Sequence, residues 1–118
     1  MVVFYSFVLL KEFVVMLSVL IASGLGAAFR YVFERFNSTF PIATLLINVG
    51  GSFIAGFAVA VDIQASSALL AFAGTFTTFS GLIAGTRALS SSRMHAFMYG
   101  HGSIALSVIA AWIGLSLG

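Results

Sequence analysis

Residues 63–86 read IQASSALLAFAGTFTTFSGLIAGT and contain no charged side chain. An α-helix of this length crosses a hydrocarbon layer about 30 Å thick, because each residue adds about 1.5 Å. Other uncharged stretches lie at residues 13–29, 36–61 and 94–118. They do not alternate between apolar and polar residues as the strands of a membrane barrel do. The sequence therefore predicts transmembrane helices at about 13–33, 40–61, 66–87 and 95–117.

The composition supports a membrane protein. Hydrophobic residues make up 61% of the 118 residues and charged residues 7%, whereas a soluble domain carries about 25% charged residues. We expect an all-α, multi-pass protein of the cell membrane, with a single four-helix domain over residues 1–118. Residues 1–12 form an extension whose status the sequence leaves open, because Met16 is an alternative start.

Several classes of function are disfavoured by what the chain lacks. It has no cysteine, and its five basic residues are scattered, so we expect no thiolate site and no binding of nucleic acid. The predicted spans hold no Asp, Glu or Lys, and Glu34 lies at the far end of the first helix. An enzyme is therefore not expected. A small multidrug cation exporter is a weaker alternative, since those proteins use a Glu inside the first helix.

Residues 74–81, Gly-Thr-Phe-Thr-Thr-Phe-Ser-Gly, are the densest polar signal. Glycine and β-branched threonine weaken a helix. A broken helix exposes main-chain groups, which a membrane tolerates only where they are buried or line a cavity. We predict that the third helix is broken here. The alternative is an unbroken packing face whose hydroxyls bond back to carbonyls one turn earlier.

Asn48 lies near the middle of the second predicted helix. A carboxamide in hydrocarbon is costly unless it is bonded, so it marks either a polar pathway or a hydrogen bond between helices. Both interpretations stay open from the residue alone. Tyr99 and Ser103, four residues apart, share a face of the last helix.

Three segments resemble the Fluc/CrcB fluoride channel family: residues 24–31 (GLGAAFRY), 41–53 (PIATLLINVGGSF) and 74–80 (GTFTTFS). The resemblance implies an antiparallel dimer that exports fluoride passively and lowers its cytoplasmic concentration. It implies a structural Na⁺ held by backbone carbonyls, here those of Gly74 and Thr77. It also implies a fluoride pathway lined by Asn48, Thr78, Phe79, Ser80 and Tyr99.

The sequence departs from the family pattern at Leu82, where the family has a second pore phenylalanine, and at Thr75, where it usually has glycine. The charges are also uneven, because one side of the membrane has only Lys11 and the other has Arg30, Arg35, Arg87 and Arg93. This bias favours one fixed orientation. A second hypothesis follows: the chain is a non-conducting or half-functional subunit that pairs with an oppositely oriented homologue instead of with itself.

Overall fold

The computed structural model describes residues 1–37, 40–61, 66–89 and 91–118. Within these ranges the chain is helical and contains no strand. The helices are α1 (Val2–Glu34), α2 (Ile42–Ala60), α3 (Ser66–Phe76), α4 (Phe79–Ala88) and α5 (Arg93–Leu117).

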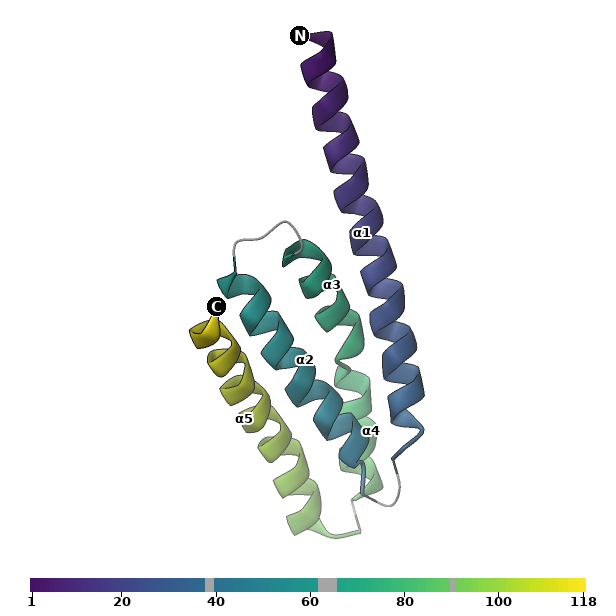
Figure 1. Cartoon of the computed structure of the whole chain (residues 1–118). Helices are drawn as coiled ribbons and strands as arrows, with labels where there is room; N and C mark the ends of the chain where they lie inside the picture. Colours follow the sequence, from purple (N-terminus) through teal and green to yellow (C-terminus); the bar gives the residue numbers. More distant parts are fainter. Residues whose placement is uncertain (38–39, 62–65, 90) are drawn as a thin grey trace.

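Four segments of the described chain are long and apolar enough to cross a membrane, and α3 and α4 together form one of them, Ser66–Ala88. The all-helical class, the four spans and the interruption of the third span are therefore confirmed. The helices run side by side as a bundle, with α1 and α5 on its outside (Figure 1). Both chain ends point toward the same end of the bundle, as an even number of crossings requires.

The first helix differs from the expectation, because it begins at Val2 and not near residue 13. The 33 residues of α1 are one continuous helix, and its N-terminal part projects beyond the other helices (Figure 1). The charged pair Lys11 and Glu12 does not end it, since exposed charges on the side of a helix leave its backbone hydrogen bonds intact.

Small residues let the helices pack closely. The most extensive contacts join α2 to α5 and α1 to α3. A Cβ atom added at Gly56 of α2 would meet the carbonyl oxygen of Ala111, and one added at Gly114 of α5 would meet that of Phe53. A Cβ at Gly26 of α1 would lie 2.5 Å from the carbonyl oxygen of Phe72 in α3. These glycines therefore serve packing within one subunit, where close approach of backbones replaces the missing hydrophobic effect.

The third span is interrupted at Thr77 and Thr78. Thr78 is extended, with φ −146° and ψ 118°, and its Oγ1 accepts a hydrogen bond of 3.0 Å from the amide of Gly81. This is the N-cap of α4. The hydroxyls of Thr75 and Thr77 donate to the carbonyls of Ala71 (3.1 Å) and Ala73 (3.0 Å). The back-bonding proposed as an alternative thus occurs, but alongside the break and not in place of it.

The start of α2 is fixed by a residue from the preceding loop. Asn37 Oδ1 accepts a hydrogen bond from the amide of Thr44 (3.1 Å), and Asn37 Nδ2 donates to the Thr44 hydroxyl (2.8 Å). Pro41 occupies the N-cap position, where a missing N–H costs little. The first turn of α2, which precedes Asn48 by one turn, is therefore held in place by Asn37.

Candidate functional site

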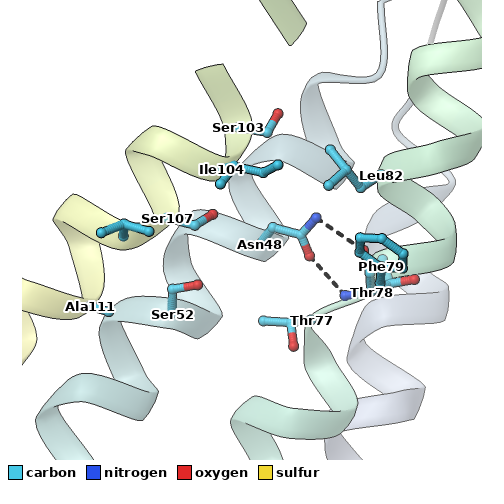
Figure 2. Close-up of a pocket in the computed structure, with 11 residues that line it drawn as sticks. Asn48, Ser52, Thr77, Thr78, Phe79, Leu82, Ser103, Ile104, Ser107 and Ala111 are labelled. Atoms are coloured by element: carbon cyan, nitrogen blue, oxygen red, sulfur yellow. Dashed lines mark hydrogen bonds between the residues drawn. The ribbon is translucent and has the colours of Figure 1, made fainter. Parts of the chain in front are cut away.

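Asn48 holds the break in the third span. Its Oδ1 accepts a hydrogen bond of 2.8 Å from the amide of Thr78, and its Nδ2 donates one of 3.1 Å to the carbonyl of the same residue (Figure 2). Asn48 and Thr78 are both at most 9% exposed. One side chain on α2 thus satisfies both main-chain groups of the residue at which α3 and α4 separate. Because both of its main-chain groups are hydrogen-bonded, Thr78 can be extended within the hydrocarbon layer.

This arrangement frees carbonyl groups at the end of α3. In a continuous helix the amide of Thr78 would donate to the carbonyl of Gly74, and that of Gly81 to the carbonyl of Thr77. Here the first amide donates to Asn48 and the second to the hydroxyl of Thr78. The carbonyls of Gly74 and Thr77 therefore lack their helical amide partners. The carbonyl of Gly74 still accepts one long hydrogen bond, of 3.5 Å, from the hydroxyl of Thr77. Gly74 is also exposed, and a Cβ atom added to it would meet no atom within 4 Å.

The break also creates a helix N-terminus inside the span. The amides of the first turn of an α-helix have no acceptor within it, and together with the helix dipole they favour an anion. The first residues of α4 are Phe79 and Ser80. The Ser80 hydroxyl lies 3.2 Å from Oγ1 of Thr78, so hydroxyl and amide donors gather at this point.

A groove of about 370 Å³ runs past the break, between α2, the α3–α4 junction and α5 (Figure 2). Asn48 lies at its centre, with Phe79 and Leu82 on one wall and residues of α5 on the other. Phe79 is 73% exposed, so its ring stands largely outside the subunit. The groove is open along one side. Its lining consists of Asn48, Ser52, Thr77, Thr78, Phe79, Leu82, Ser103, Ile104, Ser107, Val108 and Ala111.

A family model described as CrcB-like protein, Camphor Resistance (CrcB), matches residues 17–115. The chain belongs to the CrcB/FluC fluoride-specific ion channel family. It is 35% identical to the fluoride-specific ion channel FluC of Acidobacterium capsulatum, over 85% of this chain and 92% of that protein. It is 34% identical to FluC of Saccharophagus degradans (86% of this chain, 80% of that protein) and 36% to FluC 1 of Leifsonia xyli (88% and 86%).

This membership confirms the family resemblance seen in the sequence. It also confirms that the chain is a multi-pass membrane protein of a channel family, which is not a family of enzymes. The match to the family begins at residue 17, so the N-terminal half of α1 lies outside it. The four candidate spans form the part of the protein that lies in the membrane.

The structure brings some of the sequence-derived candidates together and separates others. Asn48, Thr78 and Phe79 meet in the groove. Ser80 contacts Thr78 but does not line the groove. Tyr99 is buried nearer the start of α2, where its hydroxyl donates to the carbonyl of Pro41 at 3.4 Å.

Tyr99 is linked to the groove by its neighbour on α5. Ser103 lines both the groove and the smaller cavity that contains Tyr99. It is 2% exposed, and its Oγ has no hydrogen-bond partner among the described residues. A buried hydroxyl without a partner is costly. Ser103 therefore has a free donor at the point where the two cavities meet.

Two polar lining residues, Ser52 and Ser107, were not singled out as site candidates from the sequence. Ser52 follows Asn48 by one turn of α2, and Ser107 follows Ser103 by one turn of α5. The signal that identifies them is the spacing of four residues from an already suspected polar position, which places both on the same face of their helix.

Proposed function

We propose that this chain is a subunit of a fluoride channel that lets the anion leave the cell passively and so lowers its cytoplasmic concentration. The observation that carries the proposal is the Asn48–Thr78 bridge, which lies at a helix N-terminus within a membrane span, beside a groove that also holds hydroxyl groups. The names of the family relatives support the choice of anion.

The chemistry of the groove suits a small, strongly hydrated anion, whose water must be replaced by donors. An amide NH₂ has two hydrogens, and the Thr78 carbonyl uses one of those on Asn48, which leaves one for an ion. The hydroxyl of Thr78 adds a donor when Ser80 is the donor in the hydrogen bond between the two side chains. The ring of Phe79 offers its electropositive edge. A negative-inside potential drives an anion outward by about 2.3 kcal/mol per 100 mV, so no coupling ion is needed.

The conducting unit is proposed to be an antiparallel dimer. The groove is open on one side, and Phe79 projects from that side. In a lipid bilayer such a groove is not a closed path until another surface covers it. A second subunit would close it and would receive the exposed ring of Phe79.

We propose that the carbonyls of Gly74 and Thr77 hold a Na⁺ ion between the two subunits. Sodium prefers hard oxygen ligands, and unwound backbone at a helix C-terminal end provides them in transporters. These carbonyls lack their helical amide partners, and the space beside Gly74 is open. When bound, the ion would supply a positive charge that fixes the two breaks relative to each other.

A flux experiment tests the main proposal. The purified chain is reconstituted into liposomes loaded with fluoride, a K⁺ ionophore relieves the voltage, and an electrode measures efflux. We expect fluoride efflux without chloride efflux, and its loss in Asn48→Asp, which places a carboxylate in the groove, and in Phe79→Ile, which removes the aromatic edge. Equal efflux from all three proteins would contradict the proposal.

Leu82 supports a second candidate, a partner subunit in a heterodimer. It lines the groove where the family has a phenylalanine, and an aliphatic chain offers an anion no electropositive edge. In this case the chain alone would give no fluoride efflux, and co-reconstitution with an oppositely oriented homologue would restore efflux. Robust efflux from the lone chain would exclude a need for that partner.

A further inference from the structure

A second groove, between α4 and α5, joins the groove that contains Asn48. It has a volume of about 370 Å³. Three residues line both grooves, namely Phe79, Leu82 and Ile104 (Figure 2). The two grooves therefore meet beside the break in the third span, and an ion that travels along the second groove arrives at the donors of the first.

The second groove extends from the break to one end of the bundle. Arg87, in the last turn of α4, lines it, as do Ala96 and Phe97 from the first two turns of α5. Phe79, at the inner end of the groove, is the first residue of α4. It precedes Arg87 by eight positions, or about 12 Å along the helix axis. Arg87 thus lies where the groove opens at the end of the bundle.

The walls of this groove carry few groups that can act on an ion. The two helices approach each other where Thr86 faces Gly100, since a Cβ atom added to Gly100 would lie 3.4 Å from the Thr86 hydroxyl oxygen. This hydroxyl donates to a carbonyl of its own helix at 2.9 Å, and Nδ1 of His101 lies 3.1 Å from a carbonyl one turn earlier in α5. Among the described residues that line the groove, Arg87 alone carries a permanent charge.

The charge of Arg87 is available to an ion. Its side chain is exposed, and it forms no hydrogen bond or ion pair with any residue that the structure describes. A charge at a cleft whose walls have a low dielectric constant raises the local concentration of counter-ions and their rate of arrival. The distribution of arginines predicts that this end faces the cytoplasm, which is the side from which exported fluoride would enter.

We propose that Arg87 attracts anions to the mouth of the second groove and so raises the rate at which fluoride reaches Asn48 and Thr78. It acts on entry and does not contact the ion at the break, where the hydrogen-bond donors choose among anions. The inference rests on the proposed fluoride conduction, and it adds an access route to it.

Initial fluoride efflux from liposomes tests this role with four variants. Arg87→Gln removes the charge and Arg87→Lys keeps it. Arg35→Gln and Arg93→Gln are matched controls, because both arginines are exposed at the same end of the bundle and line neither groove. At 10 mM salt, where the screening length is about 30 Å, we expect Arg87→Gln to lower efflux by on the order of twofold to tenfold. The other three variants should match wild type.

Salt distinguishes attraction from a change in packing. The screening length falls to about 3 Å at 1 M salt, so the deficit of Arg87→Gln should disappear when gluconate salts are added at that concentration. Wild-type efflux in Arg87→Gln, an equal loss in the two controls, or a loss that persists at high salt would overturn the role of Arg87 alone. A wild type without efflux, alone or beside an oppositely oriented homologue, would overturn the proposed function, and this inference with it.

Discussion

Replacing Asn48 with leucine tests whether one side chain holds the third span open. Leucine has a similar volume but can neither accept from the amide of Thr78 (2.8 Å) nor donate to its carbonyl (3.1 Å). Each hydrogen bond contributes about 0.5–1.5 kcal/mol net. Losing both removes about 1–3 kcal/mol of preference for the break, which changes its population relative to a continuous helix by about 5- to 150-fold.

The local conformation can be measured directly. Backbone chemical shifts from NMR of labelled protein in lipid nanodiscs report whether Thr78 is extended, as its φ of −146° requires, or helical. We expect the shifts to move toward helical values in Asn48→Leu, because the amide of Thr78 then donates to the carbonyl of Gly74. Fluoride efflux should fall with the population of the break.

Ser52→Ala is the matched control, since Ser52 lines the same groove one turn along α2. It should leave the shifts of Thr78 in the extended range. If Asn48→Leu kept extended shifts and wild-type efflux, the bridge would not be what keeps the span open, and the reasoning would be refuted.

Further predictions concern packing, the pore wall and the ion. Gly56→Ala should lower the thermal stability by about 1–3 kcal/mol, because its Cβ meets the carbonyl of Ala111, whereas Gly50→Ala, with open space around it, should not; equal melting curves would contradict this packing. Leu82→Phe should raise efflux of the lone chain by supplying an aromatic edge, and a fall in efflux would count against the missing-phenylalanine argument. Exchanging Na⁺ for K⁺ should lower the melting temperature of the purified protein if the carbonyl of Gly74 is a ligand, and identical melting in both salts would count against that site.

The sequence was sufficient for the spans and for the break, because both follow from local composition. The length of an uncharged stretch identifies a membrane crossing. The glycines and threonines at residues 74–81 weaken the third helix within that segment. The pairing of Asn48 with Thr78 joins residues 30 apart, and no local pattern states it. From the sequence, Asn48 could mark a hydrogen bond between helices or a polar pathway. The structure shows the hydrogen bond, and the second hydrogen of the Asn48 amide has no acceptor among the described residues.

Other differences have equally physical causes. The sequence analysis placed the start of α1 near residue 13 because the uncharged stretch from there matches the membrane thickness. No helix-breaking residue marks that position, and the helix continues back to Val2. The family resemblance assigns Tyr99 to the fluoride pathway, and this stays a prediction. The hydrogen bond of its hydroxyl to Pro41, 58 residues away, is a long-range contact that no local pattern indicates.

The length of α1 has a consequence for the bilayer around the protein. A helix of 33 residues is about 50 Å long, well beyond an acyl layer of about 30 Å. Val2, Phe4 and Leu9 are exposed near its free end, so water is a poor solvent for the part that extends past the bundle. A mismatch of this kind is relieved by tilting or by local thickening of the lipid. We expect the chain to partition into thicker bilayers when vesicles of different acyl length compete for it.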